Sequence, residues 1–253
     1  VLRRLKRDVL KDLPDKLEKD MFSPLESEQK ELYEAHTERL RLMLGMQSDA
    51  EFRTSKLQIL AEITRLRQIC CYPGLVYEGY KGNSSKLEMC MELVQNAVNG
   101  GHKILLFSQF TTMLDVLAER LKKAKISFYV LTGATSKEKR ARLVKAVNED
   151  DTSVFCISLK AGGTGLNLTA ADIVIHYDPW WNLAVQNQAT DRAHRIGQKN
   201  VVSVYRLFMK DTIEERIRAL QEMKRELADE ILSGEGIGQA LISREEVLEL
   251  LGR

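Results

Sequence analysis

The second half of the chain alternates short apolar runs with amphipathic stretches. Runs that are apolar on both faces predict strands covered by helices on both sides. They are KILLFS (103–108), ISFYVL (126–131), SVFCIS (153–158), DIVIHY (172–177) and VVSVYRLF (201–208). Between them, Thr111–Ala124 and Ser136–Glu149 carry apolar residues at helical spacing. Strands and helices taking turns are typical of a parallel sheet, so we predict an open α/β layer.

The flanking regions look helical. Before Lys103 the chain has long charged amphipathic stretches and almost no strand signal, so we expect helices there, which form either a subdomain or a cap on the sheet. After the last predicted strand, Asp211–Leu232 has helical spacing, and a short helix should run from Ser243 to about Leu251. The predicted segments are a basic linker (1–22), a helical subdomain with a lead-in helix (23–102), the α/β core (103–210), a long helix (211–232) and a tail helix (233–253).

Composition narrows the class of protein. With 44% hydrophobic and 29% charged residues, the chain is ordinary for a globular protein, which argues against disorder. No apolar run approaches the roughly 20 residues that a bilayer requires, so we expect no membrane contact. The chain begins without Met and carries no signal-peptide pattern, which suggests a piece of a longer protein. A net charge of +2 does not by itself indicate a nucleic-acid partner.

The cysteines point to a reducing environment. The four cysteines form no CxxC pair and have no histidines at zinc-like spacing, so we predict neither a disulfide nor a metal site. We expect them to be small buried residues of a protein in a reducing, intracellular compartment.

A glycine-rich loop follows one predicted strand. Gly162, Gly163 and Gly165 let the backbone approach a ligand or adopt positive φ, and exposed N–H groups after a strand can hold an anion. A tight crossover turn without a ligand is the alternative. A dinucleotide fingerprint is excluded because Leu168 stands where the next glycine is required. The chain also lacks a GxxxxGK[ST] loop and an acidic pair at the end of an apolar strand that could hold magnesium.

A pair of arginines lies further along. We expect a helix from Asn182 to about Arg195, on which Gln188, Arg192 and Arg195 share one face. A pair of helical arginines is usually a solvated stripe. Here, however, neighbouring polar residues fall on other faces, and arginine suits bidentate contact with phosphate.

Two tryptophans, Trp180 and Trp181, stand at the end of a predicted strand. Ligands bind at such strand ends in open α/β sheets, and an indole can stack on a ligand. The alternatives are that the pair fills the core or anchors another domain. Both are more common uses of tryptophan than stacking on a ligand.

Several stretches, in this order, resemble the second RecA-like lobe of the Swi/Snf-type ATPases, which are superfamily-two helicase-like motors that translocate on double-stranded DNA. They are RRLKRDVLKDLPDK, ITRLRQICCYPGL, KILLFSQF, YVLTGATSKEKR, SLKAGGTGLNLTAADIVIHYDPWWNLAVQNQATDRAHRIGQ and VYRLFMKDTIEERI. The resemblance covers residues 1–232, and residues 158–198 are its most specific part. It implies a RecA-like open parallel sheet with helices on both faces. It also implies an inter-lobe linker (1–22), a helical protrusion within 23–102 and a brace helix (211–232).

The resemblance also implies functional residues. Arg192 and Arg195 match arginines that act as fingers on the γ-phosphate of ATP. The matching nucleotide-side residues are Gln188, Gly163, Gly165 and Asn167. The matching nucleic-acid contacts are Ser108, Gln109, Thr132, Gly133, Ser158 and Lys160, and Trp180 and Trp181 match positions for coupling or stacking.

The family holds ATP and Mg²⁺ mainly with its first RecA-like lobe. The resemblance therefore implies two partners, the N-terminal lobe of the same protein and the backbone of double-stranded DNA, and it implies that this chain alone is inactive. Nucleoprotein and polymerase are both compatible with the family as partners on which such a motor acts. The resemblance also implies an intracellular location, either cytoplasmic (nucleoid) or nuclear.

Two other functions stay open. One is a non-catalytic RecA-like module that docks DNA or protein, although an intact set of Gln188, Arg192 and Arg195 argues against it. The other is an RNA helicase lobe, although Gln198 follows Gly197 where the DEAD-box pattern has a further arginine.

Overall fold

The computed structural model describes residues 13–162, 165–180, 182–231 and 244–252. The chain forms two compact units, each assembled from separate stretches of sequence. Unit 1 comprises Val1–Met21 and Cys90–Leu207, and unit 2 comprises Phe22–Met89 and Phe208–Arg253. The segment boundaries predicted above stay predictions.

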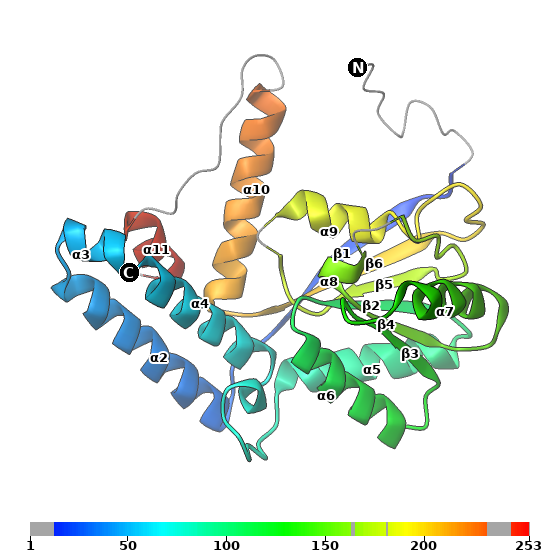
Figure 1. Cartoon of the computed structure of the whole chain (residues 1–253), viewed down its shortest axis with the longest axis horizontal. Helices are drawn as coiled ribbons and strands as arrows, with labels where there is room; N and C mark the ends of the chain where they lie inside the picture. The colour runs from blue at the N-terminus through cyan, green and yellow to red at the C-terminus, as the bar shows by residue number, and fades with distance from the viewer. Residues whose placement is uncertain (1–12, 163–164, 181, 232–243, 253) are drawn as a thin grey trace. The chain divides into compact units, whose positions relative to one another are not determined.

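The described residues form one sheet of six strands in the order β1-β6-β5-β2-β4-β3 (Figure 1). The strands are β1 (Lys16–Ser23), β2 (Ile104–Ser108), β3 (Phe128–Leu131), β4 (Val154–Ser158), β5 (Ile173–His176) and β6 (Val202–Met209). Neighbours from β6 to β3 pair in parallel. The open parallel sheet predicted from the apolar runs is therefore confirmed.

Strand β1 lies before Lys103, where the sequence carries almost no strand signal. It lies at the edge of the sheet and pairs only with β6, where the Val202 N–H donates to the Asp15 carbonyl over 3.0 Å. An edge strand tolerates charged side chains, so KLEKDMFS lacks the apolar signature of a central strand. Asp20 of β1 pairs instead with Arg206 of β6, with 2.6 Å between Oδ1 and Nε.

Helices connect the strands of unit 1. They are α5 (Ser85–Asn99), which leads into β2, α6 (Thr111–Lys123), α7 (Lys137–Glu149), α8 (Leu159–Gly162) and α9 (Leu183–Thr190). The Ser136 hydroxyl caps α7 by accepting the Lys139 N–H, as its position before a helical pattern suggests. The core of unit 1 consists of apolar side chains from the central strands, such as Leu105, Phe155 and Val174, none of which is exposed. These strands are buried on both faces, which explains their continuous apolar runs.

Unit 2 is helical. It contains α2 (Ser27–Met46), α3 (Asp49–Thr54), α4 (Lys56–Cys71), the 3-10 turn η1 (Pro73–Leu75), α10 (Ile213–Ile231) and α11 (Arg244–Leu251). Its core joins residues far apart in sequence, including Leu40 of α2, Leu66 of α4, Ile217 of α10 and Leu250 of α11. Helix α11 therefore buries its apolar face against helices that begin more than a hundred residues earlier.

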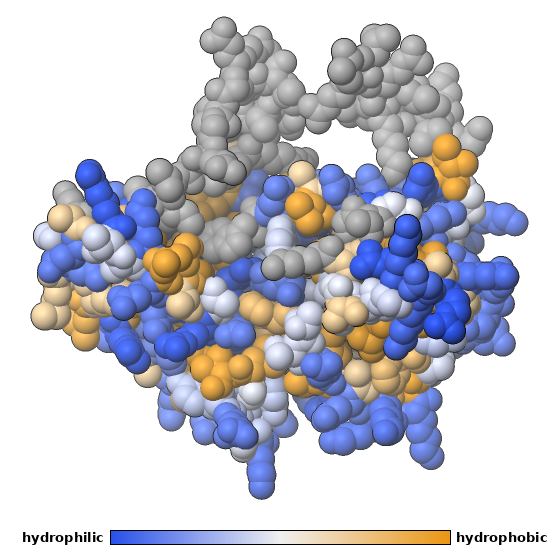
Figure 2. Space-filling model, viewed as in Figure 1, coloured by the Kyte–Doolittle hydropathy of each residue, from blue (hydrophilic) through white to orange (hydrophobic). Residues whose placement is uncertain are grey.

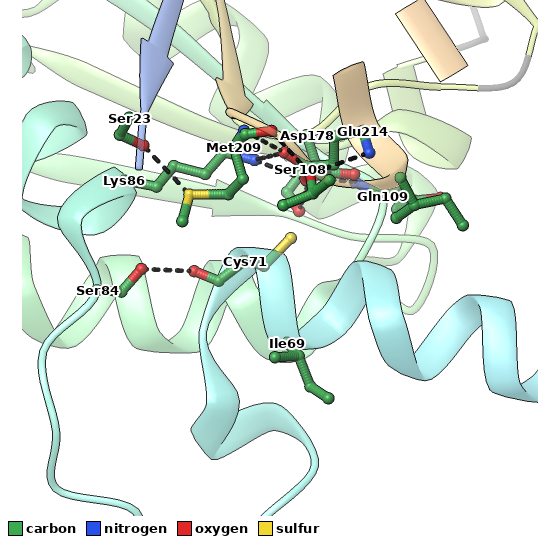
Figure 3. Close-up of polar contacts among 12 residues, drawn as sticks. Ser23, Ile69, Cys71, Ser84, Lys86, Ser108, Gln109, Asp178, Met209 and Glu214 are labelled. Carbon is green, nitrogen blue, oxygen red and sulfur yellow. Dashed lines mark hydrogen bonds and ion pairs between the residues drawn. The ribbon is translucent and has the colours of Figure 1, made fainter. Parts of the chain in front are cut away.

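A fully buried ion pair lies inside unit 2. The Lys86 ammonium donates to both carboxylate oxygens of Glu214, each over 2.7 Å, and neither side chain is exposed (Figure 3). Glu214 also accepts the backbone N–H of Met209 over 2.8 Å. The pair therefore ties the beginning of α5 to the first turn of α10 and to the end of β6.

All four cysteines are buried and free. Burial raises the pKa of the Cys70 thiol, and the neighbouring Glu214 carboxylate raises it further. Burial likewise raises the pKa of Cys156. The interpretation of these residues as small buried side chains is confirmed.

One histidine is buried in unit 1. His176 ends β5 with its ring stacked on Phe107 at 5.4 Å between centroids, and its Nε2 lies 2.8 Å from Thr190 Oγ1. Burial lowers its pKa to about 3, and the positive charges of Arg206 and Lys16 add to the effect. The imidazole is therefore neutral in the folded protein at neutral pH.

On the face shown in Figure 2, hydrophilic side chains cover much of the described surface, with apolar residues between them. Met46 and Leu57 are the most exposed of the large apolar side chains, at 85% and 82%. No helix in the described part of the chain is both long and apolar enough to cross a membrane.

We predict that Glu214→Gln destabilises the chain by about 3–5 kcal/mol, because it leaves a buried ammonium without its counter-charge. The free energy of unfolding in urea measures this. Glu34→Gln is the matched control, since Glu34 pairs with Lys30 on the exposed face of α2, with 63% of the Glu34 side chain accessible. It should change stability by less than about 1 kcal/mol. Equal losses in the two variants would contradict the prediction.

We predict that His176 makes the folded chain less stable as pH falls below about 6.5. The unfolded imidazole binds a proton near its ordinary pKa, whereas the folded one resists protonation down to about 3. Stability should therefore fall by up to about 1.4 kcal/mol per pH unit through this window. Urea unfolding at several pH values measures the slope, which His176→Gln should flatten. Thr190→Val keeps the imidazole and should keep the slope.

Candidate functional site

Strand ends line up at the carboxyl edge of the sheet. Ser108, the last residue of β2, pairs in register with Ser158, the last residue of β4. Leu131 of β3 pairs with Ile157, which places Thr132 beside Ser158. Phe107 pairs with His176, which places Gln109 beside Asp178. Four of the predicted nucleic-acid contacts, Ser108, Gln109, Thr132 and Ser158, thus come from adjacent strand ends.

At this edge a buried carboxylate binds the end of β2. Asp178 is 1% exposed, and its Oδ1 accepts the Ser108 hydroxyl over 2.5 Å (Figure 3). The Gln109 N–H lies 3.3 Å from each oxygen of the carboxylate. The Ser108 hydroxyl also accepts the Phe110 N–H over 3.1 Å. Sequence reasoning did not single out Asp178, although its place directly after an apolar strand is the signal that could have found it.

Thr132 and Gly133 form a turn after β3. The Thr132 N–H donates to Thr135 Oγ1, and the Thr135 N–H donates to the Thr132 carbonyl, each over 3.1 Å. Gly133 is exposed, and an added Cβ would meet no heavy atom within 4 Å. The backbone of this turn is therefore accessible from solvent.

Ser158 and Lys160 follow β4. Ser158 is 3% exposed, and its hydroxyl oxygen has no hydrogen-bond partner in the described part of the chain. Lys160 lies in α8 by its backbone. The serines of this edge are buried in the structure, whereas the turn at Gly133 is open.

The glycine loop is described from Gly165 onward, and Gly163 lies outside the described residues. Gly165 has a φ of +44°, a conformation that favours glycine. Asn167 is exposed, and its carbonyl accepts the Asn148 side-chain amide over 2.9 Å. The Leu168 N–H donates to the Arg192 carbonyl over 3.1 Å, which joins the glycine loop to the arginine segment.

The arginine segment corrects the expected helix. Helix α9 ends at Thr190, so Arg192 and Arg195 lie in the following turns and do not share a helical face with Gln188, which is exposed on α9. The Arg192 N–H bonds the Ala189 carbonyl over 3.2 Å, and the Arg195 N–H bonds the Ala193 carbonyl over 3.1 Å. This short-range pattern tightens the chain into turns after the helix.

Gln198 holds these turns in place. Its side-chain Nε2 donates to the carbonyls of Ala171 and Ala193, over 2.8 and 3.2 Å. Its Oε1 accepts the N–H groups of Lys199 and Asn200, each over 2.8 Å. Gly197 precedes it with a φ of +102°, which a residue with a side chain adopts only with strain. The sequence "IGQ" therefore fixes the backbone that carries the arginines.

The two guanidinium groups differ in environment. Arg192 is partly buried, and burial lowers its pKa, with a further decrease from Arg195 and an opposing effect of Asp191. Arg195 is exposed, and its guanidinium has no ion pair or hydrogen bond within the described part of the chain. Arg195 is thus a positive charge on a backbone held by hydrogen bonds.

The tryptophans are placed only in part. The Trp180 side chain is partly buried against the apolar core of unit 1. The backbone N–H of Trp180 donates to the side-chain oxygen of Gln186 in α9 over 3.3 Å. Trp181 lies outside the described residues. A packing role is visible for Trp180, and the stacking and coupling roles stay predictions.

The predicted residues therefore fall into two groups within unit 1. One is the carboxyl edge with Ser108, Gln109, Thr132 and Ser158. The other joins the loop after Gly165 to the arginine turns. Helix α9 connects them, because it follows Asp178 and precedes Arg192. The assignment of roles to these residues stays a prediction.

Comparisons with known proteins show the family to which the chain belongs. The family described as the helicase conserved C-terminal domain matches residues 85–197, and the SNF2-related domain matches residues 1–75. The chain is 39% identical over 252 residues to a protein of Mycoplasma pneumoniae named an uncharacterized ATP-dependent helicase, across 99% of this chain and 24% of that protein. The chain spans about a quarter or less of the length of the curated relatives it matches, from 26% down to 14%.

Solved structures extend the likeness to the fold. The Sulfolobus solfataricus SWI2/SNF2 ATPase C-terminal domain matches with a TM-score of 0.76 at 30% identity, over 94% of this chain and 99% of that one. The Sulfolobus solfataricus SWI2/SNF2 ATPase core in complex with dsDNA matches with a TM-score of 0.78 at 32% identity, over 99% of this chain and 53% of that one. The parallel sheet, the two family models and the match to 99% of a solved C-terminal domain all point to one family. This chain belongs to the SNF2 family of superfamily-two helicase-like ATPases and is a C-terminal RecA-like lobe of that family.

Proposed function

We propose that the chain is the C-terminal motor lobe of an ATP-dependent double-stranded DNA translocase of the chromatin-remodeller type. It supplies Arg192 and Arg195 as arginine fingers for ATP held by an N-terminal RecA-like lobe, together with half of the DNA grip. The observation that carries the proposal is the pair of arginine turns held by Gln198, with the Arg195 guanidinium exposed and without an ion-pair partner in the described chain. A surface arginine with only a structural role has no need of such a fixed backbone.

The donor groups of this segment fit a nucleotide phosphate. Gln188 offers an amide, and a guanidinium can donate two parallel hydrogen bonds to phosphate oxygens. Among the described residues, no group of three or more His, Cys, Asp and Glu side chains is suited to a metal ion. On this proposal Mg²⁺ and most of the ATP contacts therefore belong to the N-terminal lobe.

The proposed chemistry is electrostatic. Bound ATP supplies the phosphoryl group whose transfer to water drives the motor. Charge spreads over the oxygens of the transferred group in the transition state, and a guanidinium placed against them stabilises that charge. Because the arginines lie on this lobe and the ATP site on the other, hydrolysis requires the two lobes to close. Repeated closure would then move the two DNA grips relative to each other.

The proposed DNA grip lies at the carboxyl edge of the sheet. A translocase must hold the backbone without reading the bases, which hydroxyl groups, backbone N–H groups and one lysine can do. The open turn at Thr132 and Gly133 offers backbone groups to a phosphate. The similar Sulfolobus solfataricus SWI2/SNF2 ATPase core was solved in complex with dsDNA, which supports DNA over RNA as the ligand.

We predict that DNA-stimulated ATPase activity appears only when this chain follows its N-terminal lobe in the longer protein. There, Arg195→Ala should lower the rate by about 10³-fold or more, because an arginine finger contributes on this scale. Arg142→Ala is the matched control, since it removes the same charge from an exposed position on α7, and it should keep the activity.

Full activity in the Arg195→Ala protein would remove Arg195 from the catalytic role. A longer wild-type protein without ATPase activity would favour the docking module, and stimulation by RNA alone would favour an RNA helicase. Turnover by the isolated chain would contradict the assignment of the ATP site to the other lobe.

We also predict that Lys160→Ala in the longer protein lowers the salt dependence of DNA binding. Removing one phosphate contact should reduce the slope of log K against log salt concentration by about 0.9. Fluorescence anisotropy with duplex DNA at several salt concentrations measures the slope. Lys123→Ala is the control, because Lys123 is exposed at the far end of α6. An unchanged slope in Lys160→Ala would remove that lysine from the grip.

A further inference from the structure

Asp178 occupies an unusual position for a carboxylate. It is 1% exposed, yet it lies at the strand edge where the proposed DNA grip is found. A buried carboxylate is costly unless hydrogen bonds compensate it. Here the Ser108 hydroxyl and the Gln109 N–H donate to it across 70 and 69 positions of sequence. A negative charge would also repel DNA, so an exposed contact is not its role.

On one side, Asp178 organises the loop after β2. The Ser108 hydroxyl donates to Asp178 and accepts the N–H of Phe110, the residue that precedes α6. With the Gln109 N–H directed at the same carboxylate, the loop 108–110 wraps around it. The conformation of Ser108 and Gln109 therefore depends on this carboxylate.

On the other side, the Asp178 segment is joined to α9 at two places. Just after Asp178, the backbone N–H of Trp180 donates to the side-chain oxygen of Gln186, in the middle of the helix. Just before it, His176 Nε2 lies 2.8 Å from the hydroxyl of Thr190, the last residue of the helix. The arginine turns begin directly after Thr190. A displacement of the segment around Asp178 would therefore be transmitted along α9.

We propose that Asp178 is a positioning residue that couples the DNA grip at Ser108 and Gln109 to the arginine turns at Arg192 and Arg195. It touches neither ATP nor DNA; it sets the loop 108–110 and the start of the α9 segment relative to each other. This inference rests on the proposed function of the chain as a motor lobe. A shift of about 1 Å in a catalytic group can cost about 100-fold in rate, so a hydrogen bond at this junction is sufficient to affect hydrolysis.

The test uses Asp178→Asn in the longer protein that carries the N-terminal lobe. ATPase rate is measured against the concentration of linear duplex DNA, which separates the rate at saturating DNA from the apparent Kd for DNA. We expect the rate at saturating DNA to fall about tenfold or more toward the DNA-free rate. The apparent Kd for DNA should rise by less than the rate falls, because the substitution displaces the loop 108–110 without removing a DNA-binding side chain. Substitution of a residue that contacts DNA directly would instead raise the apparent Kd more than it lowers the rate at saturating DNA.

Asp172→Asn is the matched control. Asp172 precedes the same strand, β5, is 8% exposed, and accepts hydrogen bonds from His102 and Asn200. It lies at the amino end of the strand, so the same substitution should keep the stimulation by DNA. Thermal unfolding of both variants shows whether each is folded.

Ser108→Ala breaks the same hydrogen bond from the other partner with a smaller change. Asp178→Asn removes the negative charge that strengthens this hydrogen bond, whereas Ser108→Ala removes the bond itself. In a double-mutant cycle the two losses should therefore not add, because both act on the same contact. Full stimulation of the Ser108→Ala protein by DNA would overturn the inference. This test holds even when the Asp178→Asn protein does not fold. Stimulation retained by a folded Asp178→Asn would overturn it while the proposed function stands. A wild-type protein without stimulation would overturn the proposed function itself.

Discussion

The parallel direction of the strands is the constraint on which the rest of the structure depends. Because every strand from β6 to β3 runs the same way, each one ends at the same edge of the sheet. Residues separated by up to 70 positions, such as Ser108 and Asp178, thereby become neighbours. Central strands can run in parallel only when helices bury both faces, so the apolar runs that form the core also determine where the polar strand ends meet.

The two units use different means to fix their helices. In unit 1 the backbone after α9 is fixed by side-chain amides and hydroxyls, among them Gln198 and Thr190, which bond groups from other segments. In unit 2 the first turn of α10 is fixed by charge, through Lys86 and Glu214. Each kind of polar contact fixes the position of one particular residue in the fold, whereas apolar packing alone fixes such a position less sharply. The proposed motor function requires such precision, because the arginine turns would have to return to one geometry in every ATPase cycle.

Much of the fold could be predicted from the sequence, and the exceptions have physical reasons. The central strands were predictable because burial on both faces leaves a continuous apolar run, as at Ile104–Ser108. Strand β1 was missed because an edge strand can carry charges such as Asp20, which pairs with Arg206 of a strand far along the chain. The site residues were named through the family resemblance. The bond between Ser108 and Asp178 was beyond sequence reasoning, because no local pattern records a contact over 70 positions.

The end of α9 shows the same limit in a single helix. Helical spacing continues from Gln188 to Arg195 with no proline or glycine to stop it. The helix nevertheless ends at Thr190, whose side chain is hydrogen-bonded to His176. Three residues later, the Ala193 carbonyl accepts a hydrogen bond from the Gln198 side chain. Tertiary hydrogen bonds thus override a local preference. The arginines gain a fixed backbone by this means and lose the regular helical face that the spacing alone implied.

The burial of all four cysteines has a practical consequence for observing this lobe at work. A thiol reacts with maleimide reagents as the thiolate, and burial keeps Cys70 and Cys156 protonated and inaccessible. A single cysteine introduced at an exposed position, such as Lys123 on α6, would therefore carry a fluorophore or spin label while the native thiols stay in place. The closure proposed for the two lobes of the longer protein then becomes accessible to distance measurement on single molecules, while the native packing of both cores is retained.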